Sequence, residues 1–164
     1  MHSMYELERP ANCSIGRAMD ILGERWTFLI LRECFYGVRR FSDMQRNLGI
    51  ARNILSSRLQ NLVRAGILER RRYQEEPERF EYKLTLAGRD LYPAIITIMR
   101  WGDEHLIGDS GPPVVLRHTC GAEAEPVLVC GHCHEPMDPR DVTPEPGPGA
   151  RTDDPRSPVA TGQR

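Results

Sequence analysis

The 164-residue sequence predicts a mainly α-helical fold that carries one small β-hairpin. Three observations support this prediction. Apolar residues recur at helical spacing between residues 15 and 65. After Gly66 the pattern changes to alternation over two short stretches, which is typical of paired strands. Helical spacing returns after Thr85 and continues to about residue 106.

The first helical zone extends from about Ile15 to Tyr36. Ser14 is its expected N-cap, because a serine hydroxyl can accept a hydrogen bond from a free backbone N–H. Gly23 is a candidate break that would divide the zone into two helices. A broad apolar stripe would face the core, and it consists of Ile15, Ala18, Met19, Leu22, Trp26, Leu29, Ile30 and Cys34.

Two further helices follow and are joined by a short turn. The stretch "RFSDMQRNLG" predicts a helix with Ser42 as its cap, Asp43 in its first turn and Gly49 at its end. The next helix covers about residues 51–65, and its core-facing residues would be Leu55, Leu59, Leu62 and Val63. Two helices separated by a short turn that contains glycine form the outline of a helix-turn-helix.

The alternating region predicts a hairpin over about residues 67–86. Its strands are "ILERRRY", with Ile67, Glu69 and Arg71 on one face, and "FEYKLTL". Because this hairpin follows the second helix of the helix-turn-helix, it would form a wing.

A long helix is expected after the wing, over "LAGRDLYPAIITIMRWGDEHL". Thr85 would cap it, and Pro93 predicts a break or kink near Tyr92. A small domain cannot cover all the apolar residues of this helix, so a partner subunit would cover them. These residues are Leu91, Ile95, Ile96, Ile98, Met99, Trp101 and Leu106.

Composition divides the chain into four parts. We expect an N-terminal arm over 1–12, a winged helix-turn-helix domain over 13–107, a small Cys/His ribbon-like segment over 114–137, and a disordered tail over 138–164. The tail is rich in Pro, Gly and small polar residues, and "GDSGPPV" reads as a linker before the ribbon.

The charge of the chain is unevenly distributed. Residues 13–107 contain 16 Arg and Lys against 12 Asp and Glu, a net charge of +4, whereas residues 108–164 contain 5 against 9, a net charge of −4. A basic central block favours an anionic partner. No run of apolar residues is long enough to span a bilayer, and the N-terminus lacks the features of a secretory signal, so we expect a cytoplasmic protein.

The helix at about 51–65 has an outward side that suits DNA. The stretch "GIARNILSSRLQNLVRAG" contains no acid, although an ordinary solvated helix mixes both signs of charge. Cations and hydrogen-bonding side chains are the groups that meet phosphates and base edges in the major groove. We expect double-stranded DNA to contact Arg52, Asn53, Ser56, Ser57 and Gln60 from this helix. Arg40, at the entry to the helix-turn-helix, and Arg70, Arg71, Arg72 and Arg79 of the wing would add phosphate or minor-groove contacts.

Other functions remain as alternatives at this point. The helix and hairpin could be solvated surfaces, or the winged helix could dock another protein. An enzyme is disfavoured, because the sequence contains no nucleophile elbow, phosphate-binding glycine loop or HExxH helix.

The block from Cys13 to about Leu106 resembles the HxlR family of bacterial winged helix-turn-helix transcription regulators. The matching pieces are "CSIGRAMDILGERWTFLILREC", "GVRRFSDMQRNLGIARNILSSRLQNLVRAGILERR", "PERFEYKLTLAGRDLYP" and "MRWGDEHL". The resemblance implies a homodimer whose N- and C-terminal helices form the interface. A two-fold dimer would place two recognition helices about one DNA turn apart on a palindromic operator. A small-molecule effector is a further candidate partner.

Cys13 is a candidate redox sensor. It lies just before the first helix, where the helix dipole can lower the pKa of a thiol. In some relatives of the HxlR family a cysteine at this place senses oxidants or electrophiles. The alternative is an inert cysteine at a helix start. Cys34, on the apolar stripe, is expected to be a packing residue.

The segment "RHTCGAEAEPVLVCGHCHEPM" is a candidate zinc site. His118 and Cys120 are separated by one residue, and Cys130 and Cys133 by two. Two short turns that each offer two soft ligands could close a tetrahedral zinc site, with His132 and His134 as spare ligands. The alternatives are a degenerate hairpin without metal or a redox-active CxxC pair.

Overall fold

The computed structural model describes residues 13–150, and the arm over 1–12 and the tail from 151 onward lie outside the described residues. The described chain divides into two compact units, one of residues 24–126 and one of residues 13–23 with 127–150. Each unit is described by itself. Within residues 13–150, no helix has both the length and the apolar character that crossing a membrane requires.

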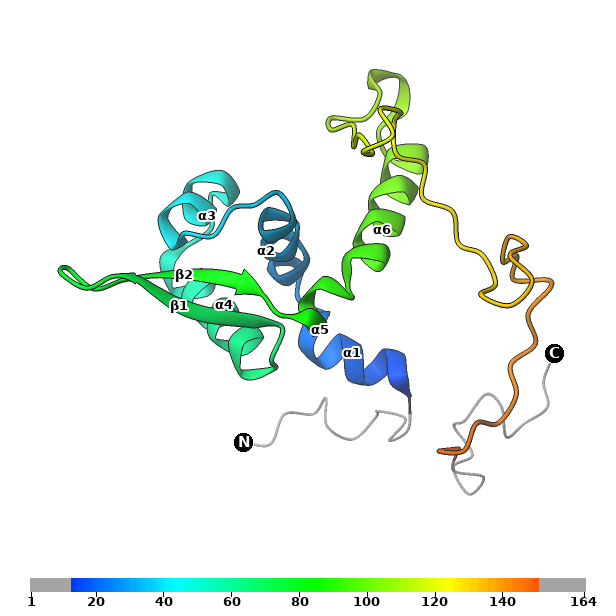
Figure 1. Ribbon diagram of the computed structural model, residues 1–164, viewed down its shortest axis with the longest axis horizontal. Helices are drawn as coiled ribbons and strands as arrows, with labels where there is room; N and C mark the ends of the chain where they lie inside the picture. The colour runs from blue at the N-terminus through cyan, green and yellow to red at the C-terminus, as the bar shows by residue number, and fades with distance from the viewer. Residues whose placement is uncertain (1–12, 151–164) are drawn as a thin grey trace. The chain divides into compact units, whose positions relative to one another are not determined.

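Three helices and the first strand enclose the core of the 24–126 unit (Figure 1). The helices are α2 (Arg25–Phe35), α3 (Phe41–Leu48) and α4 (Arg52–Arg64), and strand β1 spans Leu68–Gln74. The predicted core-facing residues Ile30, Leu55, Leu59 and Leu62 are buried, whereas Ile15 and Met19 of the predicted first stripe are 72% and 42% exposed. The buried side chains are Ile30, Leu31, Met44, Ile50, Leu55, Leu59, Leu62 and Leu68.

The turn between α3 and α4 depends on Gly49. Its φ of 61° lies in the left-handed region, and its N–H donates to the carbonyl of Gln45 at 3.0 Å. Glycine adopts this conformation without the Cβ clash that other residues meet, so α3 ends here and the chain turns directly into α4. The predicted helix-turn-helix is therefore present.

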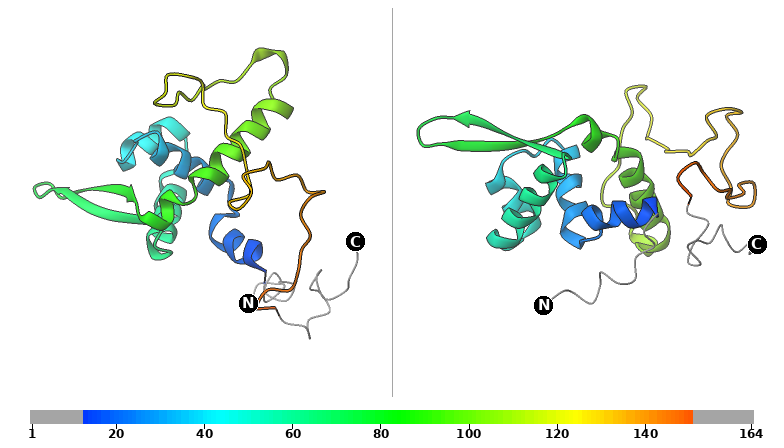
Figure 2. Two further views of the ribbon diagram at one scale, coloured as in Figure 1. Left: turned by 45° about the vertical axis from the view of Figure 1, so that its right-hand side comes forward. Right: turned by 90° about the horizontal axis from the view of Figure 1, so that it is seen from below.

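The wing is an antiparallel hairpin of β1 and β2 (Arg79–Leu84). The register pairs Leu68 with Leu84 and Arg72 with Phe80, with an irregularity between Arg72 and Gln74. The segment before α3 pairs with β2. The Tyr82 N–H donates to the Arg39 carbonyl at 2.8 Å, and the backbones of Arg40 and Glu81 form an isolated antiparallel β-bridge. The tip of the hairpin extends beyond α3 and α4 in both views of Figure 2.

The final helical region is broken, as Pro93 predicts. Thr85 caps α5 (Leu86–Arg89) by accepting the Gly88 N–H at 3.1 Å. The second helix, α6 (Tyr92–His105), has proline in its first turn, where the missing N–H costs nothing. A ring contact between Phe35 and Tyr92, at a centroid distance of 4.9 Å, packs the start of α6 against α2.

Two predicted caps are wrong. Helix α1 (Ser14–Leu22) has Cys13 as its N-cap, so Ser14 is the first helical residue rather than the cap. Helix α3 has Arg40 as its N-cap, and Ser42 lies inside the first turn. In α3 the pairing of residues 39 and 40 with β2 decides where the helix begins, and this pairing overrides the local preference for serine. The predicted break at Gly23 is present, since α1 ends at Leu22 and α2 begins at Arg25.

Candidate nucleic-acid interface

Helix α4 buries its leucines and exposes most of its polar side chains. Leu55, Leu59 and Leu62 are at most 1% exposed. Of the five residues predicted to face DNA, Arg52, Asn53, Ser57 and Gln60 are exposed and Ser56 is half-buried. The buried leucines hold the helix against the core, so its donor-rich side is presented outward on a rigid support.

Aromatic and polar neighbours orient several of these side chains. The Arg52 guanidinium carbon lies 5.3 Å from the centroid of the Phe41 ring, a cation–π distance. Gln60 donates to the Ser56 hydroxyl at 3.5 Å. Arg58 points elsewhere, because it is half-buried and 3.5 Å from the Glu24 carboxylate. The exposed cation at the start of α4 is therefore Arg52.

The wing and the segment before α3 carry a second group of cations that stack on aromatic rings of the wing. The Arg70 guanidinium carbon is 3.4 Å from the Phe80 ring centroid, and that of Arg40 is 5.0 Å from the Tyr73 ring centroid. A stacked guanidinium keeps its N–H edge free to donate, which suits phosphate recognition. Arg79 is exposed at the start of β2.

Two wing arginines are paired with carboxylates, which sequence reasoning did not foresee. Arg71 lies 2.7 Å from Glu69, and Arg72 lies 3.7 Å from Glu75 and 3.5 Å from Glu78. Such exposed pairs are weak and exchange partners readily. These two cations are therefore partly neutralised, whereas Arg40 and Arg70 stack on rings.

Glu81 at the base of the wing lies among cations. Lys83 donates to Glu81 and holds the pKa of this carboxyl below its ordinary value, and the charges of Arg39 and Arg71 act in the same direction. A lowered carboxyl pKa is the expected effect of such neighbours.

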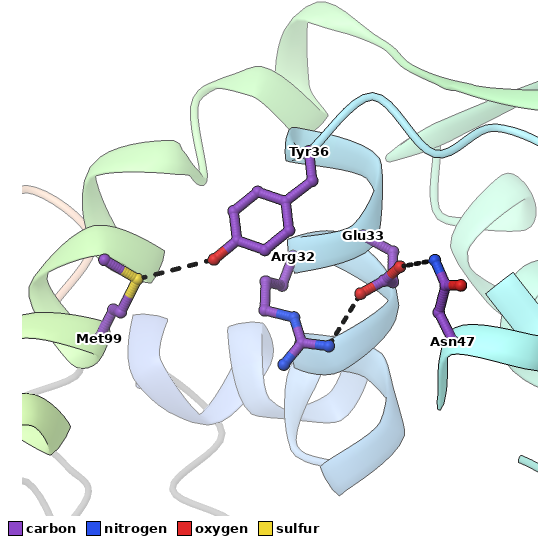
Figure 3. A network of polar contacts seen from close by, with 5 residues as sticks. All are labelled: Arg32, Glu33, Tyr36, Asn47 and Met99. Atoms are coloured by element: carbon purple, nitrogen blue, oxygen red, sulfur yellow. Dashed lines mark hydrogen bonds and ion pairs between the residues drawn. The ribbon is translucent and has the colours of Figure 1, made fainter. Parts of the chain in front are cut away.

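A buried polar network holds α2 against α3 (Figure 3). Glu33 is only 4% exposed, and its two oxygens accept from Arg32 and from Asn47, each at 2.8 Å. At the C-cap of α2, the Tyr36 hydroxyl donates to the Met99 sulfur of α6 at 3.9 Å. Sequence reasoning missed Glu33, because nothing in the local pattern shows that this acid is covered by α3.

The cysteine at the start of α1 and the cysteine at the end of α2 differ in environment. Cys13 is half-buried, and its sulfur accepts the Gly16 N–H at 3.4 Å. Burial raises the pKa of the Cys34 thiol to about 12, and the neighbouring charge of Glu33 adds to this effect. Cys34 therefore remains a neutral packing group, as the sequence predicts.

The four candidate zinc ligands lie in two small hairpins. His118 and Cys120 belong to the 24–126 unit, and Cys130 and Cys133 to the other unit. Within residues 13–150, no three His, Cys, Asp or Glu side chains are grouped closely enough to hold a metal ion. The backbone N–H groups of Cys133 and His132 hydrogen-bond to the Cys130 thiol and, together with the Cys133 side chain, lower its pKa.

An open cavity of about 820 Å³ lies between α6 and the segment of residues 112–126. Ile96, Met99, Val115 and Leu116 provide apolar walls, and Asp103 and Arg100 are among its polar groups. Arg100 also donates to the Pro126 carbonyl at 2.8 Å, which ties the segment to α6.

Comparison with known proteins places this architecture in a family. The family described as HxlR-like helix-turn-helix matches residues 21–109, more than half of the chain. An uncharacterized HTH-type transcriptional regulator of Mycobacterium tuberculosis is 59% identical over 137 residues, which cover 83% of this chain and 87% of the relative. The regulator YdeP of Bacillus subtilis is 31% identical over 102 residues, covering 62% of this chain and 80% of its own length.

Solved structures agree with this match. The crystal structure of PA1607, described as a candidate transcription factor, superposes with a TM-score of 0.75 at 32% identity and covers 82% of this chain and 94% of that one. The oxidised form of the redox regulator HypR superposes with a TM-score of 0.53 at 29% identity, over 56% of this chain and 96% of that one. These proteins are transcription regulators and not enzymes, and the chain described here belongs to the HxlR-like helix-turn-helix family of DNA-binding transcription regulators.

Proposed function

We propose that this regulator binds a palindromic operator as a homodimer, with α4 in the major groove and the wing on the flanking phosphates. The observation that carries the proposal is the division of α4 into buried leucines and an outward side without acid. The side chains assigned to bases and nearby phosphates are Arg52, Asn53, Ser56, Ser57 and Gln60.

The wing and the entry to α3 supply the phosphate contacts in this proposal. Arg40 and Arg70 are exposed and stack on Tyr73 and Phe80, so little side-chain entropy is lost when they meet a phosphate. Arg79 is exposed at the start of β2. Arg72 would exchange its glutamate partners for DNA.

The exposed apolar surface of α6 supports the homodimer. None of the residues of α6 is fully buried, and Ile98 and Trp101 are 54% and 55% exposed. Such a surface on a monomer favours association, and a two-fold axis would repeat α4 about one DNA turn away.

The direct test measures operator affinity for two variants of α4. Arg52→Ala and Gln60→Ala should each weaken binding by about tenfold or more, since one good base contact contributes roughly 1–3 kcal/mol. Circular dichroism and dimer mass should be unchanged. Arg140→Ala is the matched control, because Arg140 is an exposed arginine that pairs with Asp138 outside the winged helix. Unchanged affinity in both α4 variants would remove the groove assignment.

Salt dependence separates DNA binding from a protein-docking function. Binding through several phosphate contacts should weaken steeply as salt rises, and each neutralised wing arginine should reduce that slope by about one. A slope near zero would instead favour a protein partner.

We also propose that oxidation of Cys13 controls operator binding. Cys13 lies at the N-terminus of α1, and the similar protein HypR is described as a redox regulator. Mild oxidation should lower operator affinity in the native chain and leave Cys13→Ser unaffected. An equal loss in that variant would reject the role of Cys13.

A further inference from the structure

The cavity beside α6 is completed by a segment that lies beyond the residues matched to the HxlR-like family, which end at 109. After α6 the chain reverses through Gly108 and Gly111, whose φ values of 62° and 72° are in the left-handed region. Residues 112–126 then run back beside α6 and form the second wall of the cavity (Figure 1). Both walls belong to the 24–126 unit, so the cavity lies within one compact unit.

Hydrogen bonds hold this second wall in place. The Ala124 N–H donates to the Leu116 carbonyl at 2.8 Å within a small hairpin. At the end of the segment, Arg100 of α6 donates to the Pro126 carbonyl at 2.8 Å. The wall is therefore bonded both to itself and to α6, as is typical of a binding site that is formed before its ligand arrives.

The walls are apolar, and the charged groups around them are mainly acidic. Apolar side chains of both walls line the cavity, among them Ile96, Val115 and Leu116. Four carboxylates against two guanidinium groups give the lining a formal charge of −2 with His118 neutral. The carboxylates belong to Asp103, Glu104, Glu123 and Glu125, and the guanidinium groups to Arg100 and Arg117.

The two acids of α6 lie where a helix favours positive charge. Asp103 and Glu104 belong to the last turn of α6, and the C-terminal end of a helix carries a partial negative charge. Within residues 13–150, neither carboxylate is in an ion pair. The His105 ring in the same turn contacts Trp101 at a centroid distance of 5.3 Å. A bound cation would therefore compensate negative charge at this end of the cavity.

These features favour an amphipathic organic cation over other ligands. A metal ion does not fit, because no three His, Cys, Asp or Glu side chains within the described residues are grouped closely enough to hold one. A negatively charged lining also repels anions. An ammonium or phosphonium centre on an apolar body would place its charge near Asp103 and Glu104 and its body against the apolar walls.

The cavity and the proposed dimer surface lie on different sides of α6. With 3.6 residues per turn, Ile98 and Trp101 are on the side of the helix opposite to Ile96 and Asp103, which line the cavity. A second copy of the chain packed on Ile98 and Trp101 would therefore leave the cavity open to a small molecule.

We propose that the cavity between α6 and residues 112–126 binds one amphipathic organic cation, with its positive centre at Asp103 and Glu104. The volume of about 820 Å³ is within the range of small-molecule sites, roughly 300–1,000 Å³. Helix α4 and the wing contribute no lining residue, so binding at this site does not depend on the proposed operator binding.

The test uses tetraphenylphosphonium as the probe and tetraphenylborate, which has a similar size and shape but the opposite charge, as its matched control. Calorimetric titration of the full-length protein without DNA should find saturable binding of about one phosphonium per chain and at least about tenfold weaker binding of the borate. In NMR spectra of methionine methyl groups, the phosphonium should shift the resonance of Met99, which lines the cavity, and not that of the buried Met44.

Variants with matched charge locate the site. Asp103→Asn/Glu104→Gln should weaken phosphonium binding by about tenfold or more. Asp90→Asn/Asp109→Asn removes the same charge from exposed positions outside the cavity and should keep the native affinity. Val115→Lys places a positive charge in the second wall, at a residue that is 47% exposed, and should also weaken phosphonium binding.

Circular dichroism of each variant shows whether the helices are intact. The proposal would be overturned by any of three results in the native chain, namely no saturable phosphonium binding, equal affinities for phosphonium and borate, or an unshifted Met99 resonance. Native affinity in both Asp103→Asn/Glu104→Gln and Val115→Lys would also overturn it. An equal loss of affinity in Asp90→Asn/Asp109→Asn would do the same, because it would reveal a response to net charge alone.

Discussion

At the scale of single residues, the buried carboxylate of Glu33 depends on specific hydrogen-bond donors. It is covered by α3 and satisfied by two donors, Arg32 on its own helix and Asn47 on α3. A buried charge is tolerable only when its hydrogen bonds are made. The same contacts connect α2 to the helix-turn-helix, so this one residue links core stability to the position of α3.

Glu33→Ala should lower the free energy of unfolding by about 2–3 kcal/mol, because it leaves the Asn47 amide and Arg32 without their acceptor. Denaturant unfolding followed by circular dichroism measures this change. Glu33→Gln keeps one acceptor oxygen and should lower the free energy of unfolding by less than Glu33→Ala does. Glu69→Ala removes a half-buried surface carboxylate paired with Arg71 and should change stability by no more than about 0.5 kcal/mol. If Glu33→Ala and Glu69→Ala lowered the free energy of unfolding equally, the role given to the burial of Glu33 would be contradicted.

At the scale of elements, the base of the wing is joined to α5 by one compact junction. The Thr85 hydroxyl donates to the Gly66 carbonyl at 2.6 Å, and it accepts the Gly88 N–H at 3.1 Å. Gly88 is buried, and a Cβ on it would lie 2.3 Å from the Ile67 carbonyl oxygen. The close approach of α5 to β1 therefore requires glycine at this position, and the direction of the wing depends on it.

Gly88→Ala should destabilise the protein by about 2 kcal/mol or more, because a backbone oxygen cannot move aside as a side chain can. Thermal unfolding measures the loss. Ala87→Ser changes the neighbouring, exposed residue of the same helix and should leave the melting temperature within a few degrees of the native value. A neutral Gly88→Ala would show that the junction relaxes more easily than the structure indicates.

At the scale of the whole molecule, DNA binding and self-association would depend on different surfaces in the proposed homodimer. The outward side of α4 and the wing are polar and basic, whereas α6 exposes Ile98 and Trp101. In the proposed homodimer, the surface of α6 holds two chains together and so positions two copies of α4 and the wing. A change on α6 would then weaken operator binding without touching DNA.

Trp101→Glu should shift the protein from dimer to monomer and weaken operator binding, since it places a charge in the proposed apolar interface. Sedimentation velocity and an operator titration at one salt concentration test both effects. Trp101 is 55% exposed, so the monomer fold should survive. Asp109→Lys, an exposed change just after α6, should leave both measurements unaltered. If Trp101→Glu remained a dimer and bound the operator with native affinity, the dimer interface would lie elsewhere.

Much of this architecture could be predicted from the sequence, because local patterns determine it. The helices follow the spacing of apolar residues, Gly49 ends α3, and Thr85 caps α5. The candidate interface could also be predicted, because the amino-acid sequence itself shows that residues 49–66 contain no acid.

Tertiary structure alone decided the remaining features. The N-cap of α3 is Arg40 and not a serine because residues 39 and 40 pair with β2. Glu33 is buried because α3 folds over it, and Arg72 pairs with Glu78 because the hairpin tip brings the two residues together. Each of these features depends on residues that are distant in sequence or joined across a turn. Periodicity and capping preferences act within a few residues along the chain, and only the packed chain determines which distant groups meet.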